Sequence, residues 1–120
     1  SGGGVGSLKK KPRVYTYAVA GALTIAPGLH RIGAGAAEIK AMTLAAPSLA
    51  DDGMEMTVIS ASAYAHTVTY TAGFYGDTTS SDVATSAAKV GASITFVALG
   101  GVWGVKATSA VGTTANFTIA

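Results

Sequence analysis

The chain contains no cysteine, few charged residues and no long apolar run. Without cysteine the fold has no disulfide and no cysteine-ligated metal. Charged residues make up 12% of the sequence, against a usual fraction of roughly 25%. Apolar residues make up 49%, but Thr, Ser and Gly interrupt every apolar run before the roughly 18 residues that a membrane-spanning helix needs. We therefore expect no membrane partner, and no signal peptide, because residues 1–4 lack an apolar segment.

The charges that are present divide the chain into a basic start and a mildly acidic remainder. Residues 1–13 contain no acid, whereas residues 41–120 carry a net charge of −3. The basic residues of the start are Lys9, Lys10, Lys11 and Arg13. Glycine-rich chain is flexible, because it has little side-chain surface to bury. We predict a flexible basic arm over 1–13 and a single β domain over 14–120, a length that suits one core.

The basic arm has three interpretations. It is a solvated tail, an arm that becomes ordered on a partner protein, or a nucleic-acid contact. A flexible tether with a basic anchor gains its contacts only when it docks, which favours a protein partner. Nucleic acid is the least favoured partner, because no aromatic residue that could stack on bases precedes Tyr15.

Beyond Pro12 the sequence has the pattern of short β-strands separated by glycine-rich turns. The segments richest in β-branched, aromatic and alternating residues are 14–19, 23–25, 29–32, 39–44, 54–60, 65–71, 93–99, 102–107 and 116–119. Gly100-Gly101 between two of them predicts a hairpin. Segment 77–92 is the only plausible helical turn, with Asp82 as its cap. No internal repeat is visible, and we predict an all-β fold, an antiparallel sandwich or small barrel.

Residues that could carry chemistry are sparse. Ser60 or Ser62 with His66 and Asp77 would make a Ser–His–Asp set, but no G-x-S-x-G motif supports it. We interpret His66 as a hydrogen-bonded strand residue. The acidic cluster Asp51, Asp52 and Glu55 does not have the spacing of a calcium loop, and we interpret it as a solvated turn. The sequence therefore predicts no catalytic residue, no metal site and no cofactor, and we expect no enzyme; a small hydrolase using His66 is the rival hypothesis.

The aromatic residues offer one candidate binding surface. Tyr70, Phe74 and Tyr75 lie within six residues and could form an exposed patch for a glycan or a protein. Packing in the core or in a hairpin is the more favoured interpretation of the same three residues. For Trp103 we predict a core position with its indole N–H hydrogen-bonded.

Residues 40–120 carry a resemblance to a group of known proteins. The segments concerned are 43–47 (TLAAP), 52–59 (DGMEMTVI), 65–69 (AHTVT), 73–76 (GFYG), 83–85 (VAT), 94–98 (ITFVA) and 101–103 (GVW). Together they resemble small β-rich structural proteins of phage virions, which serve as head decoration, head-fibre or tail-fibre parts and are often trimeric. The resemblance includes no catalytic motif.

The resemblance and the composition together predict a capsid decoration, or cement, protein on the outer surface of a phage head. The body would form a homotrimer, and its low charge suits apolar flanks covered by other subunits. Lys9, Lys10, Lys11 and Arg13 would contact an acidic surface of the major capsid protein. The alternatives are a head- or tail-fibre module for host attachment, which would use the Tyr70–Tyr75 region, and a tail-tube or neck subunit.

Overall fold

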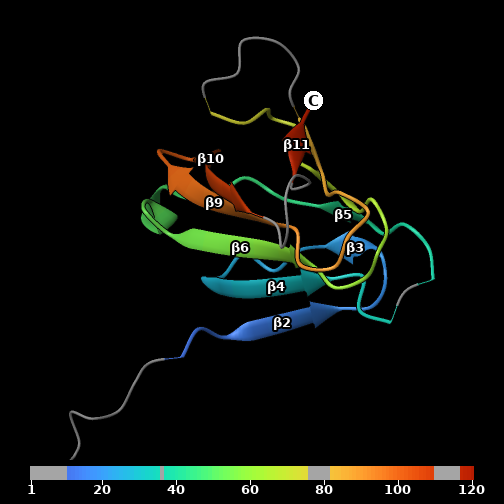
Figure 1. The fold of residues 1–120 in the computed structure, drawn as a ribbon. Helices are drawn as coiled ribbons and strands as arrows, with labels where there is room; N and C mark the ends of the chain where they lie inside the picture. The colour runs from blue at the N-terminus through green and yellow to red at the C-terminus, as the bar shows by residue number, and fades with distance from the viewer. Residues whose placement is uncertain (1–10, 36, 76–81, 110–116) are drawn as a thin grey trace, which may run out of the picture.

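The computed structural model describes residues 11–35, 37–75, 82–109 and 117–120, which are mostly strands and turns (Figure 1). The strands are β2 (Val14–Tyr17), β3 (Gly21–Ala22), β4 (Gly28–Ile32), β5 (Ala41–Thr43), β6 (Glu55–Ser60), β7 (Thr67–Thr69), β8 (Val83–Thr85), β9 (Ser93–Leu99), β10 (Val102–Ser109) and β11 (Thr118–Ile119). One short 3-10 helix, η1 (Leu49–Asp51), precedes β6. No helix within the described ranges is long and apolar enough to cross a membrane.

The strands form two five-stranded sheets. The first sheet has the order β10-β9-β6-β4-β2, and the second has the order β11-β8-β7-β5-β3. Both sheets are mixed: β2, β4 and β6 are parallel, as are β3, β5 and β7, and the remaining neighbours are antiparallel. The β-rich class is confirmed, but the prediction of antiparallel sheets is wrong for half of the strand pairs. Neither sheet closes into a barrel within the described residues.

The first six described strands, β2 to β7, wind as a coil in which the chain passes back and forth between the two sheets. From β2 to β7 each strand lies in the other sheet from the strand before it, so β2–β3, β4–β5 and β6–β7 are three successive turns of the same kind. Parallel neighbours cannot be joined by a tight hairpin, and here the opposite sheet supplies the return path. The chain therefore repeats in structure without repeating in sequence. After β7, antiparallel strands complete both sheets.

The hydrophobic core includes buried residues from strands of both sheets. In β9 every second side chain is buried, and in β6 Met56, Val58 and Ser60 share the buried face, as their alternation predicts. A chain of aromatic rings runs through the core, from Tyr70 to Phe74, Phe96 and Trp103. The Trp103 indole N–H donates to the Ala45 carbonyl at 2.8 Å, which confirms the prediction for this residue.

Of the two predicted turns, the hairpin is confirmed and the helical turn is wrong. Gly100 and Gly101 both have positive φ, 63° and 86°, and join β9 to β10 in the predicted hairpin. The helical turn expected within 77–92 is wrong for the described part of that segment: 83–85 is strand β8, paired with β7, and Asp82 caps no helix. Pairing with β7 overrides the weak helical preference of this alanine-containing stretch. Residues 77–81 lie outside the described residues.

Candidate functional site

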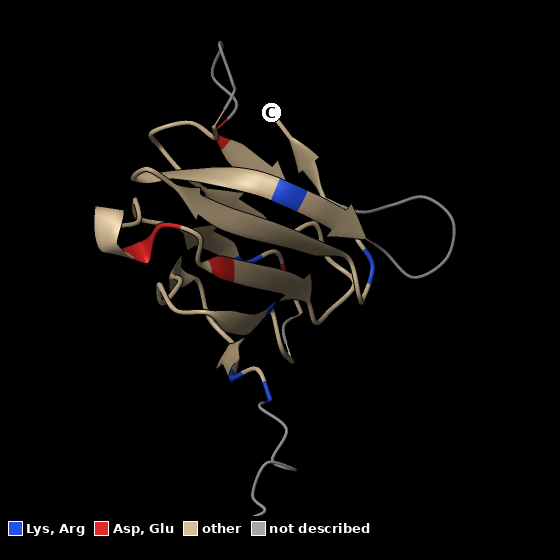
Figure 2. Ribbon diagram, turned by 90° about the vertical axis from the view of Figure 1, so that its left-hand side faces the viewer, with Lys and Arg blue, Asp and Glu red and all other residues tan. Residues whose placement is uncertain are grey.

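The basic start of the chain enters the fold at one edge of the first sheet. Lys11 and Arg13 are exposed just before β2. Basic segments, drawn in blue, lie at the end of the ribbon at the bottom of Figure 2. The Arg13 carbonyl accepts a hydrogen bond from the Leu29 N–H at 2.8 Å, so pairing with β4 begins at this residue. Lys9 and Lys10, the other two predicted contact residues, lie outside the described residues.

A stack of rings anchors this basic end to the core. The Arg13 guanidinium carbon lies 5.2 Å from the centre of the Tyr15 ring, and Tyr15 stacks on His30 with centroids 4.7 Å apart. His30 is fully buried; its Nε2–H donates to the Ala26 carbonyl at 2.9 Å. Its Nδ1 therefore accepts from the Tyr17 hydroxyl at 2.8 Å. Strand β2 is thus fixed to β4 by side chains as well as by backbone pairing.

The predicted aromatic patch is divided between core and surface. Tyr70 and Phe74 are only 2% and 4% exposed and pack against each other with ring centroids 5.4 Å apart. Tyr75 is 65% exposed. The three side chains do not form one exposed patch, because the first two fill the core, which was the favoured interpretation.

Tyr75 lies against the edge strand β10. Its N–H donates to the Trp103 carbonyl at 2.8 Å. A Cβ placed on Gly104 would lie 3.4 Å from the Tyr75 Cβ and 3.0 Å from Leu99 Cδ1. The missing side chain at Gly104 thus lets Tyr75 and Leu99, both exposed, lie close to the strand at this position. No sequence pattern indicates that Leu99 and Tyr75 both lie beside Gly104, since they are 24 positions apart.

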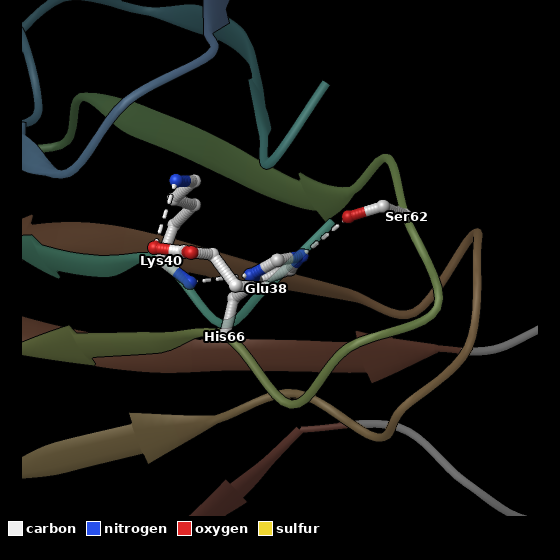
Figure 3. A network of polar contacts seen from close by, with 4 residues as sticks. All are labelled: Glu38, Lys40, Ser62 and His66. Carbon is white, nitrogen blue, oxygen red and sulfur yellow. Dashed lines mark hydrogen bonds and ion pairs between the residues drawn. The ribbon is translucent and has the colours of Figure 1, made fainter. Parts of the chain in front are cut away.

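Ser62 and His66, the two neighbouring members of the hypothetical catalytic set, are hydrogen-bonded at 2.8 Å between Oγ and Nε2 (Figure 3). The His66 Nδ1 accepts from the backbone N–H of Lys40 at 2.9 Å. A backbone N–H can only donate, so the proton of the neutral ring is on Nε2, which donates to the serine. Activation of a serine needs the reverse arrangement, with Nε2 unprotonated and Nδ1 donating to a carboxylate. Asp77 lies outside the described residues.

This network ties together the turns of the coil. Lys40 precedes β5, and Ser62 and His66 lie between β6 and β7. Gly33, which follows β4, lies with its backbone against the His66 ring. The His66 backbone N–H also donates to the Ser86 hydroxyl, just after β8, at 3.0 Å. The exposed Glu38 pairs with the Lys40 ammonium at 3.4 Å. The geometry supports a structural role for His66. Its side chain is hydrogen-bonded, as predicted, but the prediction of a strand position is wrong, because the residue lies just before β7.

The acidic residues around η1 are each held separately. The Asp51 carboxylate accepts from the N–H and the hydroxyl of Ser48, both at 3.0 Å, and closes η1. The Asp52 carboxylate accepts from the Gly100 N–H at 2.7 Å, and Glu55 pairs with the Lys106 ammonium at 2.6 Å. Among the described residues no three His, Cys, Asp or Glu side chains form a group that could hold a metal ion.

The two buried histidines predict a stability that falls in acid. Burial lowers the pKa of both His30 and His66 below 6.5, and the Lys40 ammonium lowers the pKa of His66 further, partly offset by a hydrogen bond from the ring to the Ser62 backbone. As the pH falls, the histidines of the unfolded chain therefore take up protons at a higher pH than those of the folded chain. Their contribution to the free energy of unfolding is complete above pH 6.5 and decreases as the pH falls below it. We expect a lower Tm at pH 5 than at pH 7.5.

The same expectation can be checked at each ring. Nitrogen chemical shifts of the imidazoles should show Nε2–H tautomers at pH 7.5 and titration below pH 6.5 for both histidines. Between pH 7.5 and 8.5 the Tm should not change through these groups, which gives the control. A histidine in the folded protein that titrates at or above 6.5 would contradict the prediction.

Comparison of the chain with family models, with curated proteins and with solved structures found no match.

Proposed function

We propose that this protein is a capsid decoration protein that binds the outside of a phage head and stabilises the shell. The observation that carries the proposal is the separation of charge. The described residues before Glu38 include Lys11, Arg13 and Arg31 and no acid, and the chain enters the body at this end. Such a basic end can attach to an acidic surface while the rest of the body meets neutral neighbours. The resemblance of residues 40–120 to phage virion proteins agrees with this function.

The opposite part of the first sheet supports contact between subunits. Strands β6, β9 and β10 carry only one acidic and one basic residue, Glu55 and Lys106, which neutralise each other (Figure 2). Tyr75, Leu99 and the strongly exposed Leu49 add apolar surface next to these strands. Apolar surface with little charge is typical of the centre of interfaces between identical subunits. We propose a homotrimer, together with a sandwich arrangement in which the two sheets share the core between them.

Neutralising the basic start tests the proposal. The full chain with Lys9, Lys10, Lys11 and Arg13 all changed to Gln should bind undecorated phage capsids at least about tenfold more weakly, because the four proposed charge contacts are lost. Binding of the original protein should weaken with rising salt. Co-sedimentation with capsids measures occupancy, and native mass spectrometry measures the oligomer. Removal of residues 1–12 should weaken binding in the same way and leave the body folded.

A matched variant separates this effect from a general loss of charge. Changing the exposed Lys89 to Gln removes a body charge outside the basic start and outside strands β6, β9 and β10, and it should leave capsid occupancy nearly unchanged. Equal occupancy for the four-site variant and the original protein would show that the basic start is not the contact. A monomer that ignores capsids would instead favour a fibre or host-attachment module, for which Tyr75 is the exposed aromatic residue.

A further inference from the structure

Strand β2 lies at the edge of the first sheet, directly after the basic residues Lys11 and Arg13. No described strand pairs with its outer side. In parallel pairing the N–H and C=O of alternate residues point to the same neighbour. The Arg13 carbonyl accepts from the N–H of Leu29, within β4, and the Tyr17 carbonyl accepts from the N–H of Gly33, just after β4. Arg13, Tyr15 and Tyr17 therefore face β4 with their backbone groups. Val14 and Thr16 consequently direct their N–H and C=O groups outward, and within the described residues these groups have no hydrogen-bond partner. The Val14 side chain is 51% exposed.

The other sheet edges are protected or short, which sets β2 apart. Strand β10 has a register shift between Val105 and Ala107, carries Lys106 and already accepts the Tyr75 N–H at Trp103. Bulges and lysines are common devices that prevent a further strand from pairing with an edge. Strands β3 and β11 have two residues each. Strand β2 has four residues in unbroken register with β4 and no charged side chain of its own.

Charge indicates which kind of strand fits this edge. Arg13 precedes β2, and Arg31 is exposed directly opposite Thr16 in the register of β2 and β4. A strand added beside β2 would lie about 10 Å from β4. Arg31 on β4 and a glutamate on the added strand can together span this distance by meeting above Thr16. No acid lies in β2, β3 or β4 to neutralise these cations. Two copies paired edge to edge through β2 would bring their arginines together, and like charges destabilise such pairing.

We propose that the outer edge of β2 binds an extended acidic segment of a partner protein as an added β-strand. The backbone of Val14 and Thr16 pairs with the incoming segment, and Arg13 and Arg31 select acidic side chains on it. This mode of recognition combines main-chain hydrogen bonds with side-chain selection. The proposal concerns the folded body and goes beyond attachment through the basic start, and it does not require the partner to be a capsid protein.

The test uses the full chain and three capped seven-residue peptides in which Val alternates with Glu, Gln or Lys. By fluorescence anisotropy the Glu peptide should bind up to about tenfold more tightly than the Gln peptide, and the Lys peptide should not bind. Hydrogen exchange gives the decisive pattern: the Glu peptide should protect the amides of Val14 and Thr16 and leave those of Tyr15 and Tyr17 unchanged. Changing Arg31 to Gln should weaken binding of the Glu peptide and leave the Gln peptide unaffected.

Thr16→Pro removes the outward N–H, and proline is tolerated in an edge strand where that group faces solvent. It should abolish peptide binding, with Thr16→Ser as the matched control; if Thr16→Pro does not fold, the exchange pattern and the Arg31 variant decide. Binding without protection of Val14 and Thr16 would reduce the site to charge attraction and overturn the proposal. Equal binding of the Glu and Gln peptides, or protection of both amides in the free protein, would also overturn it. Failure of capsid binding alone would leave it standing.

Discussion

Changing Gly33 to Ala should lower the free energy of unfolding by about 3 kcal/mol, by two effects that act together. Gly33 has φ +77°, where an L residue is strained, and its backbone lies directly against the His66 ring. An added Cβ would collide with the imidazole at Nε2 and would lie 2.9 Å from the Ser62 hydroxyl. Because His66 is fully buried and hydrogen-bonded at both nitrogens, the ring has no free position to move to.

Gly35 provides the matched control for this prediction. It has nearly the same φ, +70°, but no atom lies within 4 Å of an added Cβ. Gly35→Ala should therefore cost only the backbone strain, about 1–2 kcal/mol. Urea unfolding followed by circular dichroism measures both values, and exchange of the Lys40 amide should become faster in Gly33→Ala alone. Equal losses of stability in the two variants would show that the contact with His66 contributes nothing.

Changing Trp103 to Ala should destabilise the fold by about 3–5 kcal/mol, which is the range for removal of a large buried aromatic residue. The Trp103 ring is fully buried, and its centroid lies 6.5 Å from that of the Phe96 ring. Its N–H donates to the Ala45 carbonyl. Small domains are stable by only about 5–15 kcal/mol. We therefore expect the variant to be partly or wholly unfolded at 37 °C.

Two further variants divide this effect into its parts. Trp103→Phe keeps an aromatic ring but leaves the Ala45 carbonyl without its donor, and it should cost less than Trp103→Ala by a clear margin. Leu49→Ala, at a side chain that is 74% exposed, should change stability by no more than about 0.5 kcal/mol. The measurement is again circular dichroism in urea, since Trp103 is the single tryptophan and its fluorescence is lost. A Trp103→Ala protein as stable as Leu49→Ala would contradict the assigned core position.

The alternation of residue types was enough to predict the best strands. Segment 93–99 is a strand with the predicted bounds, and the buried face of 54–60 contains the expected Met56 and Val58. Gly100-Gly101 predicted its hairpin because few other residues adopt two successive positive φ angles. Local chemistry of this kind is contained in neighbouring residues, so it can be recognised without knowledge of the partner strands.

The sequence by itself determined the β class, the strongest strands, one hairpin and the basic start of the chain. Only the tertiary structure decided which strands are neighbours, because a period of two is the same in parallel and antiparallel pairs. It also decided that Tyr70 and Phe74 are buried while Tyr75 is exposed, and that the proton of His66 is on Nε2. Each of these outcomes depends on contacts between residues far apart in the chain, such as Lys40 with His66 and β2 with β4, and the coil that brings them together leaves no repeat in the sequence.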